Sequence, residues 1–125
     1  MTSSDPRGET GMVTAETAVA LPIIAAFALL LLWLIGAGIA EVQLVDAARD
    51  GARSIARGDD ESAVRAQIAA TAPAESRLSV VHEGSIVTVE VSASAQPPGW
   101  LLVPLPAIPL RAAASTEVEP SAGRD

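Results

Sequence analysis

The hydrophobic pattern changes several times along the chain, and its first part predicts a membrane helix. Residues 17–40, between Glu16 and Glu41, form a stretch of 24 residues without a charged side chain. As a helix, this stretch would be roughly 36 Å long, against about 30 Å for the hydrocarbon core of a bilayer. We therefore predict one transmembrane segment at 17–40, with a kink near Pro22, because a proline inside a helix removes a backbone hydrogen bond. A buried helix of a soluble protein is the alternative, but the rest of the chain has too little apolar surface to cover it.

Beyond the apolar stretch, the pattern becomes that of an amphipathic helix. Apolar residues recur every three or four positions from Val42 to Ala56, and charged residues occupy most of the others. Gly58 is well placed to end this helix. We therefore predict a single N-terminal helix over residues 12–57, partly in lipid and partly in water.

Small side chains at two places along this helix are candidates for helix packing between subunits. Gly36 and Ala40 lie four residues apart near the end of the apolar stretch, and Ala48, Ala52 and Ala56 form a stripe on the amphipathic part. Helices can approach each other closely where their side chains are small. We expect subunits to associate through these positions.

A short second helix is predicted over residues 61–72, with Val64 and Ile68 as its apolar stripe and a proline following it. The acidic run 59–61 precedes this helix and supplies an N-cap and first-turn carboxylates that complement the helix dipole. Because the run has no neighbouring His and no calcium-loop spacing, we assign it no metal. No cofactor is predicted either.

From residue 77 onward the period becomes two, which is typical of strands. Residues 78–82 and 86–91 are rich in β-branched side chains and are separated by a turn that needs Gly84, so they predict a hairpin. Residues 110–118 alternate well enough to form the next antiparallel strand. The predicted fold class is therefore α+β: the long N-terminal helix, the short helix and a small three-stranded antiparallel sheet.

The link between the second and third predicted strands, residues 96–109, contains five prolines and is nevertheless strongly apolar. Prolines exclude a helix or a central strand there. Of two interpretations, we expect the link to pack over the open face of the sheet; in the other, its apolar side chains face a partner or the lipid headgroups. These side chains are Trp100, Leu101, Leu102, Val103 and Leu105. The ends of the chain, 1–10 and 120–125, are expected to be unstructured.

Composition restricts the function further. The formal net charge is -7, all eight basic residues are Arg, and no Cys is present. An acidic chain without a basic face disfavours nucleic-acid binding, and without Cys there is no disulfide, thiol nucleophile or Cys-ligated metal. His82 is the only His, and no complete set of nucleophile, base and orienting group accompanies it, so we do not expect an enzyme.

The residues most suggestive of a functional site lie at the start of the apolar helix. Glu16 sits just inside it, where a carboxylate is costly and needs a partner. If the chain were cut after Gly11, the new α-ammonium group of Met12 would lie one helical turn from Glu16, in the same subunit or in a neighbour. The cut would itself create the counter-ion.

The segment Gly11-Met12-Val13-Thr14-Ala15-Glu16, followed by an apolar helix, resembles the class III signal of type IV prepilins. Together with the segment 47–53, it resembles the TadE-like minor pilins, or pseudopilins, of Flp/Tad pilus systems. The resemblance implies that 1–11 is a leader removed by prepilin peptidase and that Glu16 acts in assembly. It implies a small extracytoplasmic α+β head over 58–119. The implied partners are prepilin peptidase, other pilins, Tad assembly membrane proteins and the lipid bilayer.

Topology and processing leave alternatives open. Arg49, Arg53 and Arg57 follow the apolar stretch while only Arg7 precedes it, so the positive-inside rule alone would place the C-terminus in the cytoplasm. We expect the reverse, N-in and C-out in the cytoplasmic membrane or later in the pilus, because acidic residues are interleaved with these Arg and the resemblance requires a cytoplasmic leader. The alternatives are release by ordinary signal peptidase before Glu41, where Gly38 and Ala40 are small residues at the right offsets, and an uncleaved signal anchor.

Overall fold

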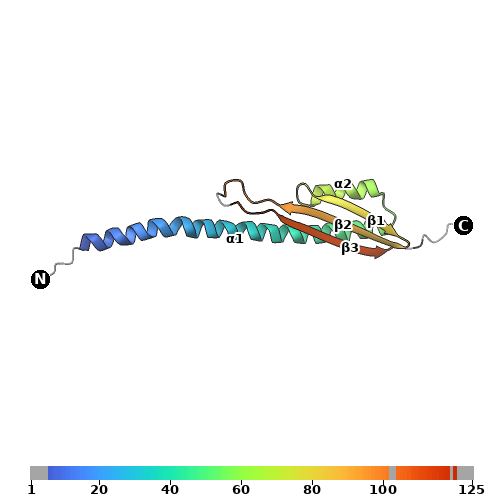
Figure 1. Cartoon of the computed structure of the whole chain (residues 1–125). Coiled ribbons are helices and arrows are strands. Elements are labelled where there is room, and N and C mark those ends of the chain that lie inside the picture. The colour runs from blue at the N-terminus through green and yellow to red at the C-terminus, as the bar shows by residue number, and fades with distance from the viewer. Residues whose placement is uncertain (1–5, 102–103, 119, 121–125) are drawn as a thin grey trace. The chain divides into compact units, whose positions relative to one another are not determined.

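The structure is a computed structural model that describes residues 6–101, 104–118 and 120. Within these residues the element order is α1 (Pro6–Ala56), α2 (Glu61–Thr71), β1 (Arg77–Glu83), β2 (Ile86–Ala95) and β3 (Ile108–Glu117), as Figure 1 shows. The strands form one antiparallel sheet in the order β1-β2-β3, which confirms the predicted α+β class. The chain divides into two compact units, Met1–Ile35 and Gly36–Asp125, and α1 contributes to both. The predicted tail lies outside the described residues except for Pro120.

The prediction that 1–10 is unstructured is wrong for its second half, because α1 begins at Pro6. Proline suits the first helical position, where its missing N–H is not needed, and Glu9 in the first turn complements the helix dipole. Gly8 and Gly11 weaken a helix by about 1 kcal/mol each relative to alanine but do not forbid one. Pro22 lies inside α1 without interrupting it, so the kink there stays a prediction.

Gly58 ends the first helix as predicted. Its φ of 89° is left-handed, its N–H donates to the carbonyl of Ile55 at 2.9 Å, and the N–H of Asp59 donates to the carbonyl of Ser54 at 3.1 Å. These two bonds form a Schellman motif, which satisfies carbonyls that the helix end would otherwise leave unpaired. The chain then turns directly into α2.

The acidic residues before α2 only partly fulfil their predicted role. Asp60 occupies the N-cap position with an extended backbone, but its side chain makes no capping hydrogen bond. Its carboxylate instead accepts a hydrogen bond from the Ser62 hydroxyl. Val64 and Ile68 are buried, as the apolar stripe predicts, and the helix ends at Thr71.

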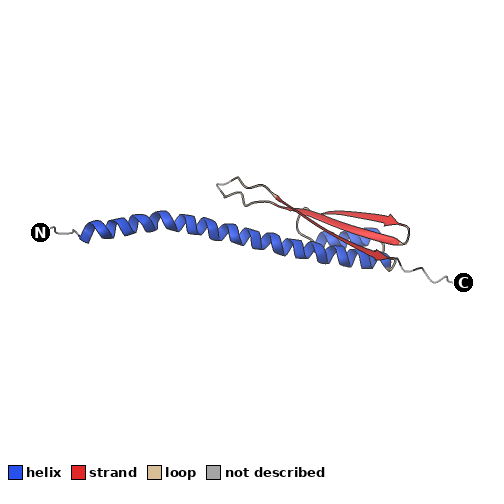
Figure 2. Ribbon diagram, turned by 60° about the horizontal axis from the view of Figure 1, so that its bottom comes forward, coloured by secondary structure: helices blue, strands red, loops and turns tan. Residues whose placement is uncertain are grey.

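The core lies between the sheet and the two helices, and Figure 2 shows α2 and the C-terminal part of α1 on the same face of the sheet. The central strand supplies Val87, Val89 and Val91, all fully buried. The opposite face carries polar side chains: the hydroxyls of Thr88 and Ser115 are hydrogen-bonded across β2 and β3 at 2.8 Å. One face on the core and one open to solvent is the usual arrangement for an antiparallel sheet.

Both hairpins have well-defined registers. In the first, Glu83 pairs with Ile86, and Gly84 has the positive φ of 60° that the intervening two-residue turn requires. In the second, β2 and β3 pair from Ile86 opposite Glu117 to Ala95 opposite Ile108.

The second hairpin corrects the predicted boundaries of the link. Its strands extend further than predicted, so the link shortens to residues 96–107, and Pro109 belongs to β3. That strand lies at the edge of the sheet, where a missing N–H is tolerated.

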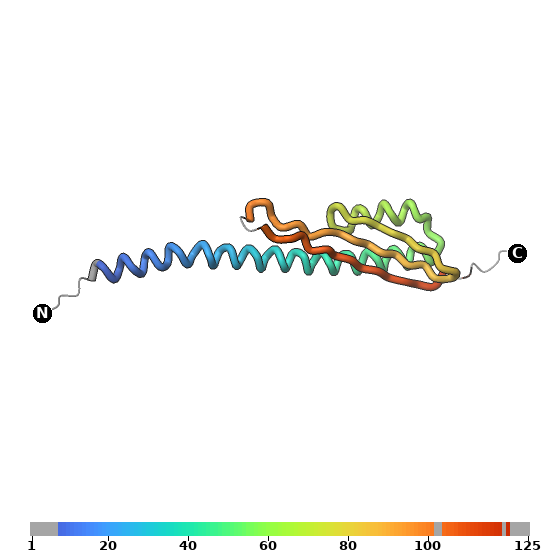
Figure 3. The backbone as a smooth tube through the Cα atoms, in the orientation of Figure 1, coloured from blue at the N-terminus to red at the C-terminus, as the bar shows by residue number. Residues whose placement is uncertain are grey.

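The link does not fold over the open face of the sheet, so that expectation is wrong. Figures 1 and 3 show its described residues, 96–101 and 104–107, continuing beyond the ends of β2 and β3. Pro98 and Leu101 close a turn in it, with the N–H of Leu101 donating to the carbonyl of Pro98 at 3.0 Å. Prolines keep this segment out of the ladder. Its Leu102 and Val103 lie outside the described residues.

Candidate functional site

The candidate processing site lies within α1. Gly11, Met12 and Glu16 are all exposed, and the Met12 side chain is 75% accessible. Met12 and Glu16 are one turn apart on the same face of the helix, as predicted. A Cβ added at Gly11 would meet no atom within 4 Å, so nothing in the described chain itself requires glycine there.

Two hydroxyl groups beside Glu16 are satisfied within the helix. Thr14 donates to the carbonyl of Thr10 and Thr17 donates to the carbonyl of Val13, both at 2.9 Å. A hydroxyl bonded to the preceding turn can enter an apolar environment without leaving its polar hydrogen unpaired. At the start of the apolar stretch, the Glu16 carboxylate is therefore the polar group that is costly to transfer into an apolar environment.

One helix in the described part of the chain is long and apolar enough to cross a membrane. None of its most apolar window of 18 residues is buried against other described residues. Large side chains such as Ile23, Phe27 and Leu32 are about three-fifths exposed. A core helix of a soluble protein would be covered by its own chain, so this stretch has the exposure of a membrane or partner-facing helix.

The two residues proposed for packing at the end of the apolar stretch differ in their surroundings. Gly36 is open, with no atom within 4 Å of an added Cβ. Ala40 is half-buried and packs against the core of its own chain. The buried face of α1 begins at Ala37, which is 8% exposed. Only Gly36 of the proposed pair is therefore fully available to another helix.

The alanine stripe that we expected to pack between subunits is instead buried within its own chain. Ala48, Ala52 and Ala56 are 0%, 1% and 8% exposed, because the chain's own head covers them. The periodicity correctly located an apolar helix face, but it could not identify what covers that face. Their small side chains serve packing within one chain.

Gly51 is a packing residue whose role the sequence pattern did not indicate. A Cβ at this position would lie 2.7 Å from Cδ1 of Ile68 and 3.4 Å from Cγ1 of Val89. Gly51 therefore lies where side chains of α2 and of the sheet approach the backbone of α1 closely. The only sequence signal for this packing role is that Gly51 lies in the segment 47–52, in which all residues except Arg49 and Asp50 are small.

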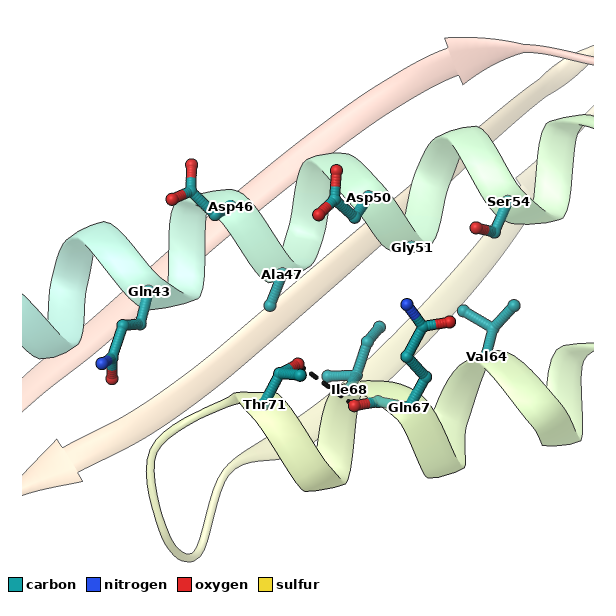
Figure 4. A pocket seen from close by; sticks show the side chains of 10 residues that line it. All are labelled: Gln43, Asp46, Ala47, Asp50, Gly51, Ser54, Val64, Gln67, Ile68 and Thr71. Carbon is teal, nitrogen blue, oxygen red and sulfur yellow. Dashed lines mark hydrogen bonds between the residues drawn. The ribbon is translucent and has the colours of Figure 1, made fainter.

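A groove of about 180 Å³ separates α1 and α2. Ten residues line it, as Figure 4 shows: Gln43, Asp46, Ala47, Asp50, Gly51, Ser54, Val64, Gln67, Ile68 and Thr71. The carboxylates of Asp46 and Asp50 point away from α2 in this view, and the Thr71 hydroxyl donates to the carbonyl of Gln67 in its own helix at 3.1 Å. Acidic and polar groups therefore do not converge on a common point in the groove.

The only histidine takes part in a surface ion-pair cluster. Glu61 accepts hydrogen bonds from the Arg65 guanidinium at 2.6 and 3.1 Å, and its other oxygen lies 3.7 Å from Nε2 of His82. The Arg65 hydrogen bonds hold the pKa of the Glu61 carboxyl below its usual range, and the smaller influences of the Arg65 and His82 charges act in the same direction. All three side chains are substantially exposed.

The acidic run before α2 is engaged with other side chains. Asp59 pairs with Arg57 at 3.2 Å, and Glu61 pairs with Arg65. Among the residues that the structure describes, no group of His, Cys, Asp or Glu side chains is arranged to hold a metal ion. No protein-family model, curated protein or solved structure matches the chain.

Proposed function

We propose that this chain is a TadE-like minor pilin: a single-pass protein of the cytoplasmic membrane that is processed by prepilin peptidase after Gly11 and acts in assembly of a Flp/Tad pilus. The observation that best supports this proposal is the exposed apolar stretch of α1. It directly follows the segment 11–16 and continues as a helix into the head. An apolar helix that its own chain leaves uncovered requires lipid or other helices around it.

The free energy of inserting this helix into a bilayer is expected to be favourable. Twelve Leu, Ile, Val and Phe residues lie within 17–40. Each contributes about 0.3 to 0.6 kcal/mol when central in the bilayer and less toward its surfaces, so the twelve together contribute at most about 4 to 7 kcal/mol in favour of insertion. The Glu16 carboxylate would oppose this by about 2.5 kcal/mol if it were carried to the bilayer centre, and by less near the headgroups. The helix therefore supports membrane storage even with Glu16 ionised.

Glu16 would act as the assembly contact. After cleavage, the α-ammonium group of Met12 and the Glu16 carboxylate carry opposite charges one turn apart, or they meet between neighbouring subunits. Removing one partner of a buried pair leaves the other charge unpaired, at a cost of about 3 to 5 kcal/mol when fully buried. Such a pair would fix the register of neighbouring helices.

The orientation is proposed as N-in and C-out. Arg57, one of the basic residues that opposes this orientation in the positive-inside count, pairs with Asp59 at 3.2 Å. Arg53 lies in the last turn of α1, where a positive charge complements the helix dipole. These local roles account for basic residues in a head that carries an excess of acidic ones.

Release by signal peptidase after Ala40 is the alternative. The surroundings of the Ala40–Glu41 peptide bond favour a chain that keeps its apolar helix as a membrane anchor. Ala40 lies inside α1, and the next buried residue of the same helix, Leu44, is fully buried in the head core. The membrane segment and the head therefore share one continuous helix across the bond that signal peptidase would cut.

The experiment that tests this function is piliation with Glu16→Ala in the native strain. We expect a processed, membrane-resident protein that fails to co-purify with pilus components and fails to support piliation. Glu41→Ala is the matched control, since it removes a carboxylate from the other end of the same apolar stretch and should leave piliation intact. Normal piliation with Glu16→Ala would refute an assembly role for this carboxylate.

A further inference from the structure

We propose that Trp100, in the link between β2 and β3, is the centre of a second membrane contact, which lies in the lipid headgroup layer of the leaflet from which α1 emerges and includes the described link residues 96–101 and 104–107. This inference rests on the proposed membrane anchoring of α1. It adds a lipid-binding surface on the head, and this surface would hold the head against the bilayer.

The chemistry of the link suits a membrane interface. No charged residue occurs between Glu90 and Arg111, a stretch of 20 residues in an otherwise highly charged head. Trp100 is 57% exposed, although it is the largest side chain of the link. Tryptophan is enriched at membrane–water interfaces, where its ring and its polar N–H find matching surroundings. The prolines keep this surface from pairing as an open sheet edge.

The position of the link follows from contacts within the unit Gly36–Asp125. At one end of β3, Thr116 and Glu117 line a common hollow with Arg53 and Arg57, so this end lies beside the C-terminal end of α1. The link is attached at the other end of the same strand. Ten strand residues span roughly 33 Å, which equals about 22 helical residues.

Counted back from Ala56, a length of about 22 helical residues ends near Ile35, next to Gly36. The buried face of α1 begins there, at Ala37. Residues 36–40 are also the last residues of the charge-free stretch. Within the unit Gly36–Asp125, the uncharged end of the sheet is therefore inferred to lie level with residues 36–40 of α1.

The charge of the head selects the type of contact. Residues 41–125, which comprise the head, the charged part of α1 before it and the C-terminal tail, contain seven Arg and twelve acidic residues, so anionic headgroups would repel this part of the chain as a whole. A contact through Trp100 and its apolar neighbours does not need negative lipid. We therefore expect the link to bind zwitterionic membranes, and we expect added anionic lipid not to strengthen this contact.

The two tryptophans of the chain, Trp33 and Trp100, allow the anchor and the link to be tested separately. Trp33→Phe leaves Trp100 as the only reporter, and Trp100→Phe leaves Trp33. Each full-length variant is reconstituted into phosphatidylcholine vesicles whose lipids carry bromine either near the headgroups or deep in the acyl chains. Bromine quenches tryptophan fluorescence over a short range, so the loss of emission reports depth.

We expect Trp33 to lose emission with deep bromine, and Trp100 to lose more emission with shallow than with deep bromine. The control places the only tryptophan on the solvent face of the sheet, by Val81→Trp in a chain in which both natural tryptophans are Phe. Val81 is 46% exposed on β1, and a tryptophan there should keep its emission with either lipid.

Three outcomes would overturn the inference. Quenching of Trp33 without quenching of Trp100 would leave the anchor intact and refute the link contact. Absence of quenching at both positions would refute the anchor and the link together. An emission shift of Trp100 that depends on the protein-to-lipid ratio, without bromine quenching, would assign the link to a second copy of the chain instead of lipid.

Discussion

Gly51 allows the packing of the head to be tested by a single added methyl group. In Gly51→Ala, the new Cβ would lie 2.7 Å from Cδ1 of Ile68, closer than carbon atoms can approach without movement. Ile68 is only 4% exposed, so its side chain can adjust only within the core or into the groove that it lines together with Gly51. Val64 Cγ1 at 3.7 Å and Val89 Cγ1 at 3.4 Å further restrict the adjustment.

Two effects of opposite sign set the magnitude. Alanine is more favourable than glycine within a helix by about 1 kcal/mol. Overpacking of a filled core costs about 1 to 3 kcal/mol. We therefore expect Gly51→Ala to lower the free energy of unfolding by roughly 0 to 2 kcal/mol, although the same change at an exposed helical glycine would raise it.

A double-mutant cycle separates the clash from helix propensity. Ile68→Val deletes the clashing Cδ1 and by itself should cost about 0.5 to 1.5 kcal/mol. In that background, Gly51→Ala should become neutral or stabilising, so the two substitutions should be coupled by about 1 to 3 kcal/mol. Ala66→Gly, at an exposed position of α2, serves as the control for helix propensity alone.

The assay is amide hydrogen exchange of the buried strand β2 in the full-length protein in micelles, which reports the free energy of opening. Additive effects of Gly51→Ala and Ile68→Val would refute the close approach. Stabilisation by Gly51→Ala alone, equal in size to the loss from Ala66→Gly, would refute it as well.

Three further predictions concern processing, topology and charge. Gly11→Leu should leave the leader attached, because the peptidase must approach the backbone closely there, and intact mass spectrometry would detect the uncut chain; normal cleavage would contradict this. Protease added outside intact spheroplasts should digest the segment after Arg57, whereas digestion only after lysis would reverse the proposed orientation. Arg65→Ala should raise the pKa of Glu61 toward its ordinary value of 4.5, measured by NMR titration, and an unchanged pKa would contradict the hydrogen-bond assignment. Because the folded pKa is lowered, the stability that Glu61 contributes is present above pH 4.5 and is lost as the pH falls through the folded pKa.

The periodic elements of the fold were predictable from the sequence. The alternation around Val87 and Val89 correctly located the central strand, and Gly84 and Gly58 correctly marked a turn and a helix end. The helix start was missed because the residues after Pro6 are polar and show no apolar periodicity. They contain no strong helix breaker, so the helix continues through them. Strand ends were missed where Ser and Ala replace β-branched residues, because these small side chains carry little strand preference.

What the sequence could not provide was the partner of each apolar face. Ala48 and Ala52 repeat at helical spacing whether a neighbouring subunit or the chain's own sheet covers them. Only the folded chain distinguishes these cases, because tertiary contacts decide them. The same holds for Gly51, whose importance depends on Ile68, a residue of a different helix.

In the proposed function, Gly11 and Met12 flank a cleavage site and the remaining chain is a membrane-anchored pilin. The most direct measurement is the N-terminus of the mature protein, isolated from membranes of the native strain and sequenced by mass spectrometry. We expect a chain that begins at Met12 and retains the whole of α1 from that residue on. A mature N-terminus at Glu41 would instead indicate release by signal peptidase, and an intact Met1 would indicate a plain anchor; either result would refute cleavage by prepilin peptidase after Gly11.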